Sequence, residues 1–279
     1  MGSTAQTTAK SPSALTSVIL QASTAICLAV SLIASGLFVC AVPRMTTELL
    51  SRAFSVEANS PFTEDELVAA AVATRDYTVG DNDQVALYTA LGDINVQCAQ
   101  DNRSGAGAPD LSAVPFADGR YDLTALKSAL SKASERYTLD QEAISHLDDV
   151  NVVVKTAEAV FCIIAAAAAV GLIACAIKLG RKATSRVLRM AAIAVAAIFA
   201  GLAVWVALDF DGFFTFFHSL FFADGTWVFS YDSLLITMYP PEFWIGMGAV
   251  WLATPLAGCA LCLIIGQLLK MNRVSKRKA

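Results

Sequence analysis

Four long stretches without a charged residue constrain the fold of this chain more than any other feature. They cover residues 11–43, 159–177, 190–208 and 243–269. A helix of about 20 mostly apolar residues, rising about 1.5 Å per residue, crosses the hydrocarbon core of a bilayer. The sequence therefore predicts four membrane-spanning helices.

The composition supports this prediction. Of the 279 residues, 56% are hydrophobic and 16% are charged, whereas a typical soluble domain has about 25% charged residues. These values exclude a disordered, collagen-like or nucleic-acid-binding chain and argue against a soluble domain. The first apolar stretch is also longer than the core of a cleaved signal peptide, which spans about 7–15 residues. We therefore expect it to be a retained helix.

Charges are segregated between the segments that join the apolar stretches. Residues 178–189 and 270–278 each carry five basic residues and no acid, and Lys10 precedes the first stretch. Residues 44–158 carry nine basic and 19 acidic residues, and residues 209–242 carry five acidic residues and no basic one. Because basic segments remain in the cytoplasm, we expect both termini inside, with net charges of +11 inside and −15 outside.

These features predict an all-α fold. It is a four-helix transmembrane bundle with a helical extracytoplasmic cap between the first two spans and an interfacial aromatic helix between the last two. The predicted spans are residues 14–42, 151–178, 189–208 and 243–269; the extracytoplasmic segments are 43–150 and 209–242; the cytoplasmic segments are 1–13, 179–188 and 270–279.

Helix-start signals occur in the first extracytoplasmic segment. Thr63 and Glu66, followed by an apolar run, form a capping-box pattern and predict a helix over residues 63–76. Thr138 and Gln141 form a second such pattern. No Pro or Gly follows until well inside the second span, so we expect one continuous helix from there into the membrane. We also expect helices over residues 85–93 and 122–136 and a loop over 101–119.

The second extracytoplasmic segment is rich in aromatic residues. Six of the 15 phenylalanines lie within residues 213–222, which also contain His218. So apolar a segment favours a helix lying in the headgroup region. Aromatic residues that would anchor it at the interface are Trp227, Tyr231, Tyr239 and Trp244.

The chain has only two histidines, His146 and His218, and both are predicted outside and close to the same membrane surface. Histidine is suited to proton transfer near neutral pH, and a neighbouring carboxylate can fix its tautomer. Carboxylates occur near both histidines in the sequence: Asp148, Asp149, Asp211 and Asp224. The residues alone leave catalysis and simple anchoring at the interface both open.

Other chemistries have weaker support. The His-Glu-x-x-His, Gly-x-Ser-x-Gly, Walker A and Gly-x-Gly-x-x-Gly patterns are absent, so neither nucleotides nor nucleic acids are expected as partners. The two histidines with Asp149 or Asp211 leave a metal site open, but no ligand spacing defines one. Six of the seven cysteines lie within predicted spans, which gives no disulfide framework. The seventh, Cys98, has no histidine near it in the sequence.

The two histidine segments resemble the signature of a known family. Residues 142–150, Glu-Ala-Ile-Ser-His-Leu-Asp-Asp-Val, resemble one half of it. The other half is similar to residues 213–222 and to the motifs Trp227-Val-Phe, Leu234-Leu-Ile and Pro240-Pro-Glu-Phe-Trp. The pattern resembles the lipoprotein intramolecular transacylases (Lit), a family of bacterial integral membrane proteins with four helices. The first extracytoplasmic segment is longer here than in compact members, and residues 101–119 are the expected insertion.

The resemblance implies an activity. The family moves the sn-2 acyl chain of a diacylglyceryl lipoprotein to the α-amino group of its terminal cysteine, which gives a lyso-form N-acyl lipoprotein. The catalytic pair of the family matches His146 and His218. The implied partners are diacylglyceryl lipoproteins and membrane lipids, and no cofactor is expected. The implied location is the bacterial cytoplasmic membrane, with the active site on the extracytoplasmic face.

The residue chemistry agrees with this activity. An α-amino group has a pKa of about 8, so histidine is a sufficient base, and the attacked ester belongs to the same molecule, which lowers the entropic cost. One histidine is expected to take the amine proton and the other to stabilise the oxyanion or protonate the leaving glyceryl oxygen. His146 held by Asp149 is the favoured base, although the sequence leaves the order open. Further supporting candidates are Asp148, Asp211 and Trp227.

Two alternative functions remain at this stage. One is a non-catalytic integral membrane protein with an extracytoplasmic partner-binding domain. The other is a metal-dependent membrane hydrolase.

Overall fold

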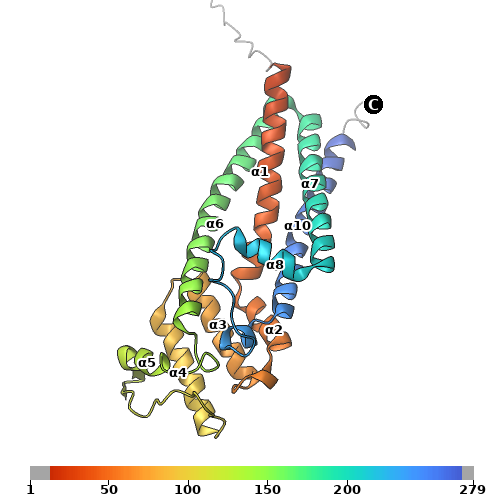
Figure 1. Ribbon diagram of the computed structural model, residues 1–279. Coiled ribbons are helices and arrows are strands. Elements are labelled where there is room, and N and C mark those ends of the chain that lie inside the picture. Colours follow the sequence, from red (N-terminus) through yellow and green to blue (C-terminus); the bar gives the residue numbers. More distant parts are fainter. Residues whose placement is uncertain (1–12, 272–279) are drawn as a thin grey trace, which may run out of the picture. The chain divides into compact units, whose positions relative to one another are not determined.

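The computed structural model describes residues 13–271, which are mostly helical (Figure 1). The predicted cytoplasmic residues 1–12 and 272–279 lie outside the described part. In chain order the elements are α1 (Ala14–Ala41), α2 (Arg44–Phe54), the 3-10 helix η1 (Glu57–Asn59), α3 (Glu64–Val79), α4 (Gln84–Gln100), β1 (Phe116–Ala117), β2 (Arg120–Tyr121), α5 (Leu123–Leu130), α6 (Gln141–Ala174), the π-helix η2 (Cys175–Leu179), α7 (Arg181–Leu208), α8 (Phe210–Ser219), α9 (Leu234–Met238) and α10 (Pro241–Met271).

Four helices are long and apolar enough to cross a membrane: α1, α6 with its continuation η2, α7 and α10. The predicted all-α architecture with four spans is therefore confirmed. The segment 179–188, predicted as a loop, is mostly helical, since α7 begins at Arg181. Only a sharp turn at Gly180 separates it from η2, and the φ of 76° there is a conformation that glycine adopts readily.

The chain divides into two compact units. The described part of the first comprises residues 13–35, 160–203 and 253–271, and the second comprises Gly36–Ala159 and Val204–Leu252. Each of the four long helices therefore contributes residues to both units. Both histidines belong to the second unit.

Small residues allow close helix contacts in the first unit. A Cβ atom added to Gly171 of α6 would collide with the hydroxyl oxygen of Thr24 on α1, so the absence of a side chain at Gly171 allows the two helices to approach closely. The Ser185 hydroxyl of α7 donates to the carbonyl of Gly266 on α10 at 2.7 Å. Small residues and hydroxyl groups are the usual contacts between helices in membranes.

The helix starts of the second unit follow sequence signals, with one exception. The capping box at Thr63 and Glu66 is present, and it begins α3 as predicted. At the start of α6, however, the predicted cap Thr138 is wrong. The Asp140 carboxylate accepts from the Ala143 backbone N–H at 2.8 Å, because aspartate directly before the first turn is the better placed and stronger N-cap.

Two helices of this unit, α2 and α9, were not predicted, and two others differ in length. Predicted residues 85–93 are part of the longer α4, and predicted residues 122–136 shrink to α5, which gives way to a serine-containing turn. Serine favours turns over helix interiors. The predicted loop 101–119 is mostly irregular, and Arg103 ties it to α3 through the Glu66 carboxylate at 2.6 Å.

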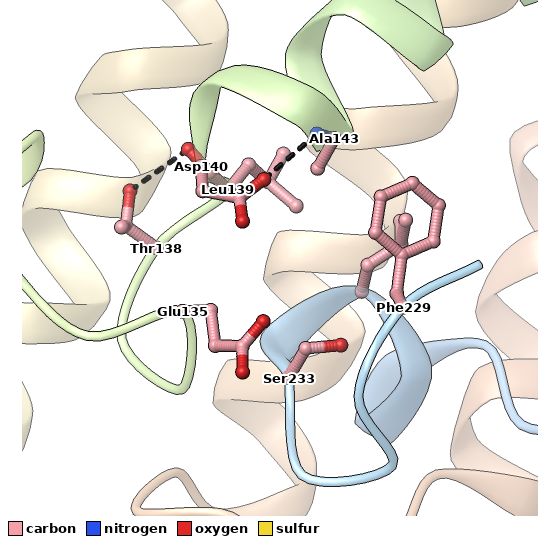
Figure 2. A pocket seen from close by; sticks show the side chains of 8 residues that line it. Glu135, Thr138, Leu139, Asp140, Ala143, Phe229 and Ser233 are labelled. Atoms are coloured by element: carbon pink, nitrogen blue, oxygen red, sulfur yellow. Dashed lines mark hydrogen bonds between the residues drawn. The ribbon is translucent and has the colours of Figure 1, made fainter. Parts of the chain in front are cut away.

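The short helix α9 packs against the segment that precedes α6. The Leu234 N–H donates to the Glu135 carbonyl at 2.8 Å. A small cavity of about 10 Å³ lies here, which is room for about one water molecule. Figure 2 shows its lining, with Glu135 and Ser233 on one side and Asp140 and Phe229 on the others.

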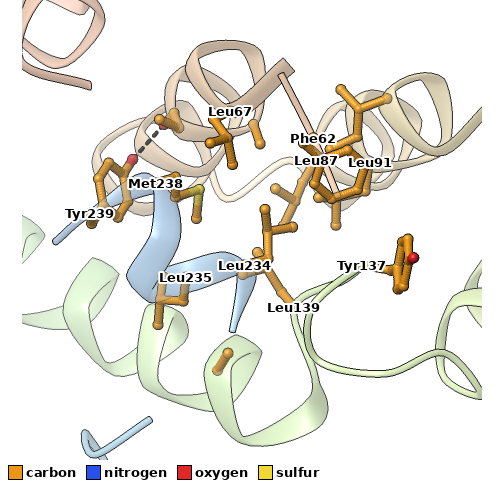
Figure 3. Close-up of a cluster of buried hydrophobic side chains, with 14 of the residues drawn as sticks. Phe62, Leu67, Leu87, Leu91, Tyr137, Leu139, Leu234, Leu235, Met238 and Tyr239 are labelled. Atoms are coloured by element: carbon orange, nitrogen blue, oxygen red, sulfur yellow. Dashed lines mark hydrogen bonds between the residues drawn. The ribbon is translucent and has the colours of Figure 1, made fainter. Parts of the chain in front are cut away.

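One apolar core holds the second unit together, and it combines residues from distant parts of the chain. Figure 3 shows α9 inserting Leu234, Leu235 and Met238 among residues of α3, α4 and the start of α6. Leu234 and Met238 are fully buried. The Tyr239 hydroxyl donates to the Ala71 carbonyl in the same region.

Polar contacts fix the start of α6 against α3. The hydroxyl of Tyr77, whose side chain is 1% exposed, donates to the Asp148 carboxylate at 2.5 Å, and the Asn82 amide donates to the same oxygen at 3.0 Å. The Asn151 amide also donates to the Thr78 carbonyl at 3.0 Å near the end of α3. These bonds set the rotation of α6 about its axis.

We expect Tyr77→Phe to destabilise the protein. The change removes a hydrogen bond to the Asp148 carboxylate, which then keeps only its bond from Asn82. Loss of a hydrogen bond to a charged group costs about 1.5–3 kcal/mol. Thermal unfolding in detergent micelles should therefore show a lower Tm. Tyr231→Phe is the control, since that side chain is 82% exposed, and its Tm should match the wild type. Equal Tm values for the two variants would contradict the stabilising role of Tyr77.

Candidate active site

The structure brings the two histidines together from different helices. His146 lies in the second turn of α6 and His218 in the last turn of α8, 72 positions apart in the chain. Their ring centroids are 6.2 Å apart and the ring planes differ by 27°. His146 precedes the uncharged part of α6, which starts at residue 159, and His218 belongs to the segment that joins α7 to α10.

Helix α8 is positioned by a cap and by aromatic packing. The Asp209 carboxylate accepts from the Gly212 N–H at 2.9 Å, which starts the helix immediately after α7 ends. Trp205, near the end of α7, packs on Phe213 and Phe216 with centroid distances of 5.7 and 5.2 Å. These contacts fix which face of α8 presents His218.

A backbone hydrogen bond sets the tautomer of His218. Its Nδ1 lies 2.8 Å from the carbonyl oxygen of Phe214, one helical turn earlier. Because a carbonyl only accepts, Nδ1 carries the proton and the neutral ring has its lone pair on Nε2. His218 is therefore arranged to accept a proton at Nε2.

His146 is enclosed by aromatic rings. It is 9% exposed and contacts Phe222 and Phe229 with centroid distances of 4.8 and 5.7 Å. Its Nδ1 is buried and has no hydrogen-bond partner in the described part of the chain. A buried polar nitrogen without a partner is costly and is expected where a substrate supplies the missing group.

Burial keeps both imidazoles neutral. Burial, with a smaller effect from His218, lowers the pKa of His146 to about 4, although the Asp149 charge acts in the opposite direction. Burial also lowers the pKa of His218 below its usual value, partly offset by the bond to Phe214. At pH 7 both rings are therefore neutral and can act as bases or as hydrogen-bond donors.

The predicted supporting carboxylates make no hydrogen bond to either histidine. Asp149 is exposed and affects His146 only through its charge. Asp148 is bonded to Tyr77 and Asn82 instead. Asp211 is exposed in the first turn of α8.

The fourth supporting candidate, Trp227, packs on His218. Their ring centroids are 4.8 Å apart with the planes inclined by 30°, and Phe214 contacts the same indole edge-on at 6.3 Å. The Trp227 Nε1 is buried and also has no hydrogen-bond partner among residues 13–271.

The surface around the histidine pair is rich in aromatic rings. Neither the 10 Å³ cavity nor a larger cleft of about 260 Å³ beside Arg44 and Asp83 is lined by a histidine. Several rings of α8 and the turn after it remain exposed, including Phe216, Phe217 and Phe221. This arrangement suits a ligand that approaches along an apolar surface.

The described residues offer no evident metal-ligand set, since they contain no group of three or more His, Cys, Asp or Glu side chains in a suitable arrangement.

Sequence reasoning missed two residues of the site. Phe222 follows His218 by four positions, a helical spacing that was available as a signal. Phe229 follows α8 in an irregular segment, and nothing in the local pattern pointed to His146 as its partner.

Comparisons with known proteins agree with one another. Residues 120–244 match the family model described as lipoprotein intramolecular transacylase Lit. No protein of curated function matches the chain. The fold is similar to a solved structure of the integral membrane lipoprotein intramolecular transacylase Lit from Bacillus cereus, with a TM-score of 0.60 and 16% identity over 96% of this chain and 100% of that one.

Two solved variants of the same Bacillus cereus protein are also similar. One carries a histidine-to-arginine mutation, with a TM-score of 0.60 and 17% identity over 94% of this chain and 95% of that one. The other carries a histidine-to-alanine mutation, with a TM-score of 0.60 and 16% identity over 95% and 97%.

The depressed pKa values can be measured directly. Because the chain has only two histidines, a protein labelled with ¹³C-histidine and free of a histidine tag gives two titrating NMR signals. We expect both midpoints below 6.5, with His146 at about 4. The His146→Gln variant assigns the signals.

The same shifts predict how stability depends on pH. The unfolded chain takes up these protons near pH 6.5 and the folded chain only at lower pH. The two histidines thus stabilise the fold above pH 6.5, and their contribution is lost as the pH falls towards 4. A His146 midpoint at or above 6.5 would contradict this account.

Proposed function

We propose, because residues 120–244 match the model of the lipoprotein intramolecular transacylase family, that this chain transfers the sn-2 acyl chain of a diacylglyceryl lipoprotein to the α-amino group of its N-terminal cysteine. The observation that carries the proposal is the pair of neutral, partly buried imidazoles of His146 and His218 at a centroid distance of 6.2 Å. The product is an N-acylated lipoprotein with a free sn-2 hydroxyl group.

The nucleophile is the substrate's own amine. With a pKa of about 8, roughly a tenth of such amines are neutral at pH 7, and the amine and the ester belong to one molecule. Holding both in one site supplies the orientation that a reaction between separate molecules would have to gain. The enzyme needs no nucleophile of its own for this chemistry.

His218 is the proposed base, which reverses the order favoured from the sequence. Its Nδ1–H is directed to the Phe214 carbonyl, so Nε2 is free to take a proton. The amine nitrogen attacks the ester carbonyl carbon and the C–N bond forms. Nε2 then removes a proton from that nitrogen, which has become strongly acidic.

The same proton leaves with the glyceryl oxygen. The nitrogen and the glyceryl oxygen are bonded to one tetrahedral carbon, so a single imidazole can reach both. As the C–O bond breaks, the His218 imidazolium returns the proton to that oxygen. No net proton is gained or lost, and His218 ends in its starting tautomer.

His146 is the proposed hydrogen-bond partner of the leaving oxygen. Because its pKa is about 4, it is neutral at pH 7 and donates one N–H without carrying charge. The rings of Phe222 and Phe229 exclude water around it, which strengthens such a bond.

The apolar surface around the pair suits a lipid-linked substrate. The exposed rings Phe216, Phe217 and Phe221 offer contact to acyl chains, while the peptide part of the substrate remains in water. The distribution of charge described above supports an extracytoplasmic location for this surface, the side on which the diacylglyceryl group of a mature lipoprotein lies.

Removal of either histidine should slow transfer strongly. We expect His218→Ala to lower kcat by about 10²–10⁴-fold through loss of the base and His146→Ala by about 10²-fold through loss of one transition-state hydrogen bond. The measurement is mass spectrometry of a diacylglyceryl lipopeptide after incubation with purified protein, which locates the acyl chain on nitrogen. Added imidazole should partly restore His218→Ala.

Neighbouring serines provide matched controls for these variants. Ser219→Ala and Ser145→Ala change exposed side chains one position from each histidine and should retain wild-type rates. Full conversion by both histidine variants would overturn the proposed roles. Lack of conversion by the folded wild type would favour the partner-binding alternative, and loss of activity in chelator would favour the metal-dependent one.

Membrane orientation has its own test. In a background in which the native cysteines are replaced by alanine, Asp110→Cys and Lys182→Cys introduce exposed thiols. An impermeant maleimide should label the first in intact cells and the second only after the membrane is permeabilised. The opposite pattern would put the histidine pair in the cytoplasm and contradict the proposed substrate access.

A further inference from the structure

We propose that the indole N–H of Trp227 donates a hydrogen bond to the carbonyl oxygen of the acyl group during transfer, and this rests on the proposed function. Among the described residues, five buried side-chain polar atoms have no hydrogen-bond partner. Three are hydroxyl groups on or immediately after α2, and the other two are His146 Nδ1 and Trp227 Nε1. Both of these nitrogens belong to rings that contact His218.

An unpartnered buried N–H is expensive. Leaving it unsatisfied costs about 1–3 kcal/mol, and most buried polar groups in folded proteins are paired. The indole can only donate, so whatever completes it must be an acceptor. The rings that contact it, His218 and Phe214, leave it without an acceptor, whereas the ester of the proposed substrate brings a carbonyl oxygen.

The chemistry needs a donor at this place. When the amine attacks, the carbonyl oxygen gains negative charge, and a donor held in advance lowers the barrier. His218 cannot supply it, because its only N–H is bonded to Phe214 and its Nε2 is the base. The adjacent indole is fixed by ring contacts and needs no reorganisation to donate.

A second tryptophan nearby differs from Trp227 in having a hydrogen-bond partner for its indole N–H. Trp244 also contacts Phe214, with a centroid distance of 6.4 Å. Its Nε1–H already donates to the Tyr239 carbonyl at 3.1 Å. Of these two neighbouring indoles, only Trp227 has its donor free for a ligand.

The test separates the donor from the ring. Trp227→Phe keeps an aromatic side chain and removes the N–H, and replacement by the benzothiophene analogue of tryptophan exchanges the N–H for sulfur at nearly constant shape. Trp244→Phe is the matched control. For each variant, kcat and KM for a diacylglyceryl lipopeptide and the Tm in micelles are measured.

We expect both Trp227 variants to lose about 10²-fold in kcat with KM nearly unchanged. The Tm of the benzothiophene variant should not fall, because the indole N–H has no hydrogen-bond partner among the described residues. Trp227→Phe also loses packing on His218, so the benzothiophene variant is the one that isolates the N–H. Trp244→Phe should keep its kcat and lose Tm, since it gives up an existing bond.

The outcomes are distinguishable. A wild-type kcat in the benzothiophene variant would overturn the inference and leave the proposed function standing, as would a loss confined to KM or Tm. A wild-type protein that converts no substrate would overturn both.

Discussion

Burial of α9 in the core of the second unit is the interaction on which the site depends. Leu234 and Met238 have no exposed surface, and burying two such side chains contributes about 3–6 kcal/mol relative to leaving them in water. This anchors the far end of the segment that begins at the end of α7. With Trp205 packed on α8 at the near end, both ends of the segment are held, and His218 is kept against His146.

Desolvation gives the two imidazoles their chemical character. In water each would be partly cationic near neutral pH. Among phenylalanine rings the charged form is disfavoured, and His218 further lowers the pKa of His146. A neutral pair suits proton transfer between a substrate amine and a leaving alkoxide, because it can accept a proton without first losing one. The carboxylates near the histidines in the sequence do not orient the imidazole rings. The group that orients His218 is the backbone carbonyl of Phe214.

The sequence predicted some elements well because their causes are local. The capping box at Thr63 and Glu66 depends on residues three apart, and the spans depend on uncharged runs. A prediction failed where a second capping residue lay close to the predicted one, or where the hydrogen-bond partner of a side chain lay far away in the sequence. Asp140 replaced Thr138 as a cap, and Asp148 is directed to Tyr77, 71 positions away, which no local pattern indicates.

By itself the sequence determined that the chain has four membrane-length helices, because hydrophobic length is an additive property of consecutive residues. It also singled out two histidines and, through their flanking residues, a resemblance to one family. Only the tertiary structure decided that the rings lie 6.2 Å apart, which tautomer His218 adopts and that Trp227 has an unpaired N–H. These properties depend on distances between segments far apart in the chain, and those distances are set by the packing of α8 and α9 rather than by any neighbouring residue.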